Sequence, residues 1–137
     1  MNDLLYIVDQ SALTDFCAEL RGAAWLALDT EFIREQTYYP QLCLIQVASA
    51  DRVACIDPLA LPSLEPLLDL LYDPAVTKVL HAARQDLEIF YHLRGVVPTP
   101  VFDTQLAALA LGQGTQIGYA ALVQQLLGVE LDKTHTR

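Results

Sequence analysis

The sequence predicts one α/β domain, in which a mixed β-sheet carries helices on its faces. Three strand-like apolar runs joined by short connections come first, and helical and strand patterns then alternate, which supports this class. The 137 residues are enough for one domain with a hydrophobic core. A hydrophobic fraction of 53% and a charged fraction of 18% are typical of a globular chain rather than a disordered one.

Strand patterns dominate the first half of the chain. Residues 24–32 form a near-continuous apolar run, which is typical of a buried strand. Residues 42–48 and 52–56 follow as strands joined at Ala50-Asp51, so we expect an antiparallel meander. The other elements expected here are a strand over residues 4–8, a helix capped by Ser11 that runs to about Leu20 and is stopped by Gly22, and a bend over residues 37–40.

Helices and strands alternate in the second half. A helix capped by Ser63 is expected to run to about Tyr72, and another over residues 84–93 ends at Gly95. Leucines 64, 67, 68 and 71 form the apolar stripe of the first helix, and residues 87, 90 and 91 are expected to face inward in the second. The remaining predicted elements are strands over 77–80 and 101–102, a helix that begins at Asp103 or Thr104 and ends at Gly112, and a helix over 119–127 closed by Gly128.

The bulk charge and the cysteines limit the function classes. A net charge of −9 has the wrong sign for binding nucleic acid through the overall charge of the protein. It does not exclude a nuclease in which bound cations contact the phosphate. Cys17, Cys43 and Cys55 have no metal-type spacing, and their odd number and apolar neighbours suggest reduced thiols. The N-terminus does not resemble a signal peptide and no apolar run approaches membrane-spanning length, so we expect a cytoplasmic protein with no membrane partner.

A pair of carboxylates follows the apolar part of the 24–32 strand. Asp29 and Glu31 are two residues apart, so on a strand they point to the same face. Two adjacent carboxylates repel each other, and a divalent cation with oxygen ligands would relieve that repulsion. The alternative is a strand that simply reaches the surface and ends in polar residues.

A second acidic position follows the 77–80 strand, at the type of junction where α/β sheets bind ligands. Asp86 opens the next helix there, and it also has an ordinary interpretation as a residue that caps the helix or complements its dipole. His81 is similarly interpreted as a hydrogen-bonded core histidine, and Asp103 as a helix cap. A solvated surface is the default for the scattered basic residues Arg34, Lys78, Arg84 and Lys133.

Six ordered blocks of the sequence resemble one family. They read LDTEF, TYYPQLCLIQ, IDPL, KVLHAARQDLEIF, FDTQLAALALG and LGVELDK, and they run in order from about Trp25 to Lys133. The chain resembles the ribonuclease D family and, more broadly, the DEDD 3′-5′ exonucleases on a ribonuclease H-like fold. A lone Asp-x-Glu is weak evidence, whereas ordered blocks with these spacings are specific.

The resemblance implies a 3′-5′ exoribonuclease that acts on RNA with a free 3′ end, such as tRNA precursors. It implies that Asp29, Glu31 and Asp86 are the catalytic metal ligands, with Asp29 shared by two ions, and that Phe32 and Ile33 contact the terminal nucleotide. Two ions roughly 3.5–4 Å apart can activate a water and stabilise the departing oxygen. Carboxylate and water ligands suit Mg²⁺ or Mn²⁺.

The sequence departs from the family pattern at its end. The family's third motif, a Tyr followed by an Asp on a helix after the LDK segment, does not occur before Arg137. We therefore expect residues 1–137 to be the front part of an exonuclease domain, C-terminally truncated and weak or inactive by itself. An exposed apolar surface near the last helices is also expected, and dimerisation through it.

Two other functions remain open from the residues. A phosphatase of the haloacid dehalogenase type also places paired acids after an apolar strand, but it uses Asp-x-Asp where this chain has Glu31, and no convincing downstream lysine motif occurs. A non-catalytic module that binds RNA or protein on the same fold is the other alternative. Binding without turnover that is insensitive to a chelator would favour that module.

Overall fold

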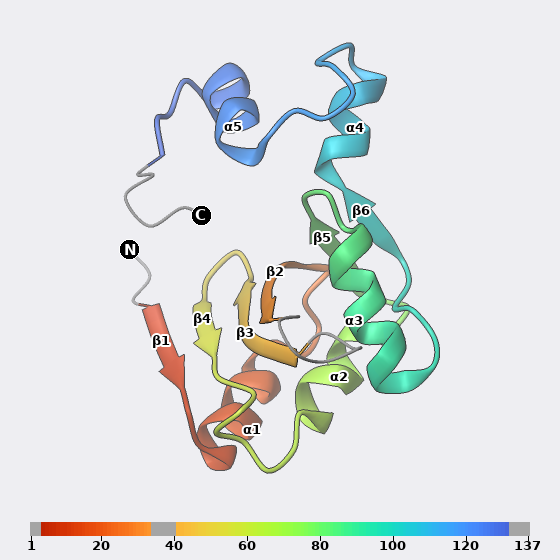
Figure 1. Cartoon of the computed structure of the whole chain (residues 1–137). Helices are drawn as coiled ribbons and strands as arrows, with labels where there is room; N and C mark the ends of the chain where they lie inside the picture. Colours follow the sequence, from red (N-terminus) through yellow and green to blue (C-terminus); the bar gives the residue numbers. More distant parts are fainter. Residues whose placement is uncertain (1–3, 34–40, 132–137) are drawn as a thin grey trace.

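The computed structural model describes residues 4–33 and 41–131, and these form a six-stranded mixed sheet with helices, which confirms the predicted α/β class (Figure 1). The strands are β1 (Leu4–Ile7), β2 (Trp25–Ile33), β3 (Gln41–Ala48), β4 (Val53–Ile56), β5 (Thr77–Leu80) and β6 (Val101–Asp103). The helices are α1 (Gln10–Glu19), α2 (Glu65–Leu71), α3 (Arg84–Arg94), α4 (Thr104–Ala110) and α5 (Tyr119–Leu127). None of these helices is long and apolar enough to cross a membrane.

The strand order is β1-β4-β3-β2-β5-β6. β2, β3 and β4 form the predicted antiparallel meander, and the outer strands join it in parallel through the pairs β1–β4, β2–β5 and β5–β6. The pairing with β5 covers only the first three residues of β2, Trp25 to Ala27. The rest of β2 therefore continues past its parallel neighbour, with β3 beside it on the other side.

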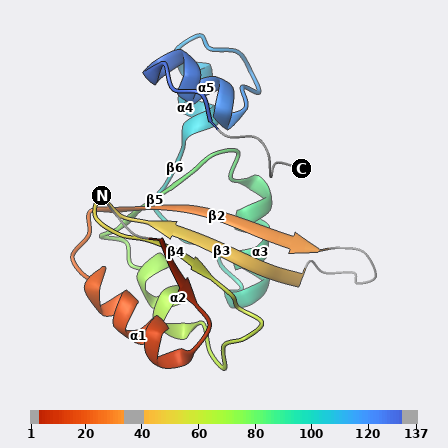
Figure 2. The ribbon, with the colours of Figure 1, turned by 90° about the vertical axis from the view of Figure 1, so that its left-hand side faces the viewer.

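The register gives the sheet one covered face and one outer face. A row of side chains that includes Thr30 is buried on the covered face, where α1 and α2 lie together on one side of the sheet (Figure 2). The neighbouring row belongs to the opposite, outer face, because side chains alternate along each strand. The buried row is Thr30, Ile45, Ile56 and Ile7, and the outer row is Asp29, Gln46, Cys55 and Tyr6.

Three predicted helix details are wrong, although the helices exist. The N-cap residue of α2 is Leu64, without a side-chain cap, rather than Ser63. α1 is capped by Asp9 rather than Ser11: the Asp9 backbone is extended and its carboxylate accepts the Ala12 N–H at 2.8 Å. On α3, Ile89 is buried and Tyr91 is 55% exposed, although Tyr91 was expected to face inward. Asp86, Ile89 and Phe90 form the buried stripe of α3, so Tyr91 is rotated away from it by one further helical step of about 100°.

Lys78 is buried, so its predicted surface position is wrong. Its side chain has 0% exposure, and its ammonium donates to the backbone carbonyls of Asp73 and Thr99 at 2.9 and 3.0 Å and to that of Val76. Burial lowers the pKa of Lys78, and the charge of Asp73 opposes that shift. Three carbonyl acceptors satisfy the three ammonium protons, which ties the loop before β5 to the loop before β6.

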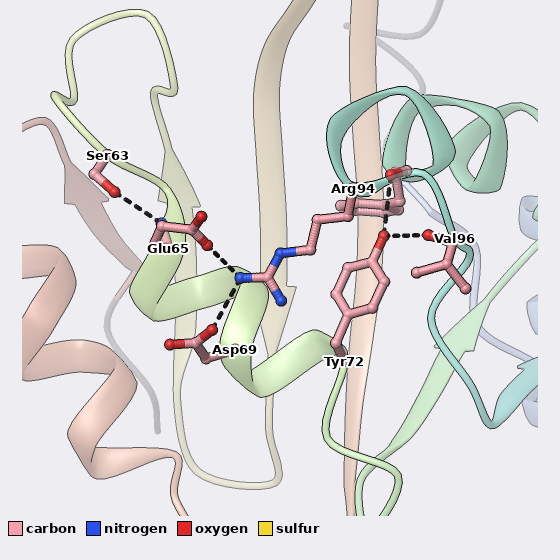
Figure 3. A network of polar contacts seen from close by, with 7 residues as sticks. Ser63, Glu65, Asp69, Tyr72, Arg94 and Val96 are labelled. Carbon is pink, nitrogen blue, oxygen red and sulfur yellow. Dashed lines mark hydrogen bonds and ion pairs between the residues drawn. The ribbon is translucent and has the colours of Figure 1, made fainter.

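A polar network joins α2 to the C-terminal end of α3 (Figure 3). The Arg94 guanidinium pairs with Glu65 and, at 2.9 Å, with Asp69, and it lies 4.9 Å from the centre of the Tyr72 ring. The Tyr72 hydroxyl donates to the carbonyls of Val96 at 2.7 Å and Phe90 at 3.0 Å. Gly95 ends α3 with a left-handed φ of +74°. The contacts of Arg94 attach this end of the helix to α2.

Several large apolar side chains of α4 and α5 are exposed, as expected for the last helices. They include Leu106, Leu109, Leu126 and Leu127. Dimerisation through this surface stays a prediction. The bend expected over residues 37–40, Arg34 and Lys133 lie outside the described residues.

Lys78→Met is expected to destabilise the fold, because methionine fills a similar volume but leaves one buried and two partly buried carbonyl bonds without their donor. The free energy of unfolding should fall by at least about 2 kcal/mol, measured by urea denaturation at neutral pH. Arg84→Met, at a side chain that is 93% exposed, is the control and should change little. Equal or higher stability of Lys78→Met would mean that the cost of burying the charge outweighs its hydrogen bonds.

Candidate active site

Asp29 and Glu31 lie on the outer face of β2, as the strand pattern predicts. Asp29 is exposed and Glu31 is half-buried. A β-bulge between Glu31 and Phe32 shifts the register with β3 at this point. Phe32 packs partly against the core, whereas Ile33 is 48% exposed. Of the two residues expected to meet a nucleotide, Ile33 is thus the more accessible.

Asp86 lies beside the part of β2 that continues past β5. It belongs to the first turn of α3 and is buried. The Thr30 hydroxyl donates to a carboxylate oxygen of Asp86, and the Thr30 backbone N–H also interacts with this carboxylate. Thr30 itself is buried between Asp29 and Glu31 in sequence. The central strand and the start of α3 are therefore joined through a residue that separates the two acids of β2.

The charges of Asp29 and Asp86 act on each other. Burial is the main cause that raises the pKa of Asp86, and the negative charge of Asp29 raises it further, while the Thr30 hydroxyl and backbone N–H lower it. A carboxyl group that is desolvated next to another carboxylate is unfavourable in its charged form. A cation between them would favour the ionised form of both groups.

The donor chemistry of these residues fits a hard divalent cation, since carboxylate oxygens are the ligands that Mg²⁺ and Mn²⁺ prefer. The structural observation that supports this fit is the burial of the Asp86 carboxylate against Thr30, the neighbour of Asp29, whose negative charge adds to the effect of burial in raising the pKa of Asp86. However, the described part of the chain contains no group of three or more His, Cys, Asp or Glu side chains that could hold an ion in its present arrangement. The expected ligand set of Asp29, Glu31 and Asp86 therefore stays a prediction.

His81 follows β5 directly and is hydrogen-bonded at both ring nitrogens. Nδ1 lies 2.8 Å from the Thr104 hydroxyl, and Nε2 lies 2.7 Å from the Ile117 carbonyl, which can only accept. The ring also meets Tyr119 edge-on, with centroids 5.6 Å apart. These contacts agree with the structural interpretation of His81, and they attach the segment before α5 to the end of β5.

Asp103 is confirmed as the cap of α4, and it does more than cap this helix. Its carboxylate accepts the Gln105 N–H at 2.8 Å and also the N–H groups of Ala82 and Ala83 at 2.9 and 2.8 Å. Burial alone would raise the pKa of Asp103, but the N–H groups of Ala83, Ala82 and Gln105 outweigh it and lower the pKa. The end of β6 therefore binds the turn that leads from β5 into α3.

Sequence reasoning missed two polar contacts. One is the hydrogen bond from Thr30 to Asp86, and the other is the bonding of Asp103 to the turn between β5 and α3. Thr30 carries no signal by itself, because an alternating strand predicts only that it faces the core. Asp103 follows a strand that is parallel to β5, and the carboxyl ends of parallel strands meet at one edge of a sheet. That adjacency was the available signal for its contact with the β5–α3 turn.

Residues 5–137 match the family model described as 3′-5′ exonuclease. This chain belongs to the 3′-5′ exonuclease family. Its relatives include the ribonucleases D of Sphingobium indicum, 55% identical, and Zymomonas mobilis, 52% identical, each over 130 residues that cover 93% of this chain and 33% of the relative. The chain thus spans about a third of the length of these curated relatives.

Solved structures of this exonuclease family share the fold. Escherichia coli RNase D, an exoribonuclease involved in structured RNA processing, has a TM-score of 0.92 at 42% identity over 98% of this chain and 36% of that one. Trypanosoma brucei RNase D in complex with RNA U12 has a TM-score of 0.83 at 23% identity over 95% of this chain and 48% of that one, and it shows the same fold. The predicted resemblance to ribonuclease D is confirmed, and the family favours the nuclease interpretation over the phosphatase alternative.

Thr30→Val should destabilise the protein by about 1.5–3 kcal/mol, the range for hydrogen bonds to charged groups, because Asp86 then loses its buried hydroxyl donor. Urea denaturation at pH 7 measures this loss. Thr77→Val, the same substitution at a half-buried position of β5, is the matched control. Equal losses in the two variants would show that the Thr30 hydroxyl contributes no more than an ordinary strand threonine.

The stabilising effect of Asp103 should disappear in acid. Its folded-state pKa is lowered, so its contribution is complete above the ordinary aspartate pKa of about 3.9 and is lost as the pH falls through the lower folded value. Asp103→Asn should therefore cost about 1–2 kcal/mol at pH 7 and clearly less near pH 3. Urea denaturation of both proteins at the two pH values tests this, and a difference that does not change with pH would contradict it.

Proposed function

We propose that this chain carries the front part of a 3′-5′ exoribonuclease site that hydrolyses phosphodiester bonds with divalent cations. The observation that supports it best is the position of Asp86 beside β2, where its buried carboxylate accepts the Thr30 hydroxyl and where burial, and then the charge of Asp29, raise its pKa. The 3′-5′ exonuclease family of the chain agrees with this chemistry.

Asp29, Glu31 and Asp86 would hold two divalent ions, Mg²⁺ or Mn²⁺. When bound, such ions activate a water and stabilise the departing 3′ oxygen. Asp29 and Glu31 present carboxylates on the outer face of β2, and the buried Thr30 between them in sequence donates its hydroxyl to the Asp86 carboxylate. Ile33 is exposed further along the same strand and would contact the terminal nucleotide, whereas the partly packed Phe32 would form one wall of that site.

The substrate we propose is RNA with a free 3′ end, of the structured class that includes tRNA precursors. The similarity to ribonucleases D and to an RNA-bound member of the fold supports RNA as the class. With a net charge of −9, the chain gains little affinity from bulk electrostatics. We therefore expect binding to depend on the cations, so a chelator should release the RNA as well as stop its hydrolysis.

We also infer that the protein works in the reducing environment of the cytoplasm. Cys17, Cys43 and Cys55 are all free thiols. Burial raises the pKa of the Cys17 thiol to about 11, which leaves it protonated and unreactive at neutral pH. Free thiols are typical of proteins in reducing compartments.

Asp29→Asn should abolish the proposed chemistry, because the substitution removes the carboxylate expected to serve both ions. With 5′-labelled single-stranded RNA and Mn²⁺, the unaltered chain should produce a ladder that shortens from the 3′ end. The Asp29→Asn variant should be slower by at least about a hundredfold, since even residues that only orient a ligand change activity by 10–100-fold. Calorimetry with Mn²⁺ should show the same loss in binding.

Asp51→Asn is the control, because it removes the same charge from the exposed turn between β3 and β4. It should leave both the ladder and Mn²⁺ binding unchanged. Equal Mn²⁺ binding by the Asp29→Asn and Asp51→Asn proteins would overturn the metal assignment. RNA binding that persists in a chelator, without turnover, would support the non-catalytic alternative.

A further inference from the structure

The turn between β5 and α3 determines where Asp86 lies. Ala82 in this turn has φ +56°, in the left-handed region that residues with a Cβ rarely occupy. Ala83 follows as the N-cap residue of α3, and it has no side chain that can cap the helix. Asp86 comes three residues later, in the first turn of α3. Any change in the backbone of this turn therefore moves the Asp86 side chain relative to β2.

The groups that stabilise this turn come from another strand. Both carboxylate oxygens of Asp103 are used: Oδ1 accepts the Ala82 N–H at 2.9 Å, and Oδ2 accepts the Ala83 N–H at 2.8 Å. Oδ1 also accepts the Gln105 N–H at 2.8 Å, which anchors the carboxylate to the start of α4. The neighbouring Thr104 hydroxyl bonds the Leu80 carbonyl at 3.2 Å. The junction of β6 and α4 thus holds both sides of the turn.

We propose that Asp103 is the positioning residue for Asp86: it holds the Ala82–Ala83 backbone in the strained conformation that brings Asp86 to Thr30 and Asp29. The hydrogen bonds of Asp103 are to backbone N–H groups, so it acts on Asp86 through the backbone of the turn. This inference rests on the proposed function, because it assigns Asp103 a role in assembling the metal ligands. It goes beyond helix capping, which α4 would require wherever it lay.

The chain contains a matched control for the capping role. Asp9 caps α1 in the same way, with a carboxylate oxygen 2.8 Å from the Ala12 N–H. It follows β1 at one edge of the sheet, whereas Asp103 ends β6 at the other edge. Asp9→Asn and Asp103→Asn both remove one charge from a capping residue and leave an amide oxygen that can still cap the helix, but only the second removes an acceptor from the β5–α3 turn.

The first experiment measures Mn²⁺ affinity by calorimetry at a temperature where each variant is folded. Asp103→Asn should weaken Mn²⁺ binding about tenfold, the lower end of the range for groups that orient a metal ligand, and Asp9→Asn by less than about twofold. The double variant Ala82→Gly/Asp103→Asn should recover part of the affinity, because glycine adopts a positive φ without strain. A role of Asp103 as a nearby charge would give no such recovery.

The second experiment needs no metal. The Leu87 N–H bonds the Ala83 carbonyl at 2.9 Å, so its hydrogen exchange, followed by NMR, reports the first turn of α3. Asp103→Asn should speed exchange of this amide by at least about tenfold and leave the amides of α1 unchanged. Asp9→Asn should leave exchange of the Leu87 amide unchanged. If Asp103→Asn does not fold, Asp103→Glu, which keeps the charge but moves the acceptor, replaces it with the same expected directions.

The outcomes separate the two proposals. If the unaltered chain shows no Mn²⁺ binding that depends on Asp29, the proposed function fails. The role of Asp103 in positioning metal ligands then fails with it, even if hydrogen exchange shows that Asp103 holds the turn. If Mn²⁺ binding depends on Asp29 but Asp103→Asn and Asp9→Asn behave alike, only the role of Asp103 is overturned. A tenfold loss that Ala82→Gly does not relieve also overturns it.

Discussion

The candidate site depends on the hydrogen bond from the Thr30 hydroxyl to the buried carboxylate of Asp86. β2 pairs with β5 only over its first three residues, and beyond them the start of α3 takes the place of a neighbouring strand. Asp86 accepts hydrogen bonds from Thr30 there, while Asp29, the residue before Thr30, remains exposed. A buried acid is thereby held beside a strand that presents two more acids, at a cost in desolvation that its hydrogen bonds offset in part.

The carboxyl ends of the parallel strands supply the rest of the support. Leu80 ends β5 and His81 follows it, while Asp103 ends β6 and Thr104 begins α4, so their polar groups meet at one edge of the sheet. Asp103 and Thr104 bond backbone groups of the other connection, and the His81 ring bonds the Thr104 hydroxyl. The bonds to the backbone of Ala82 and Ala83 therefore come from outside the turn before α3.

The opposite ends of the same elements are held independently of the site. Lys78 binds carbonyls of the loops that enter β5 and β6, and Arg94 and Tyr72 fix the end of α3 to α2 (Figure 3). The helix that carries Asp86 is therefore anchored at its far end by the Arg94 guanidinium and the Tyr72 phenol.

The sequence by itself determined the elements whose signals are local. The apolar run of β2 predicted a buried strand, and the alternation of side chains along it predicted the common face of Asp29 and Glu31. Gly95 and Gly128 marked the ends of α3 and α5. The tertiary structure alone decided the roles of Lys78, Thr30 and Asp103, because their partners are separated from them in sequence and are mostly backbone groups. A backbone acceptor or donor leaves no trace in residue type, so the residue types alone could not show the partners of Lys78 and Asp103, and the partner of Thr30 lies 56 residues away.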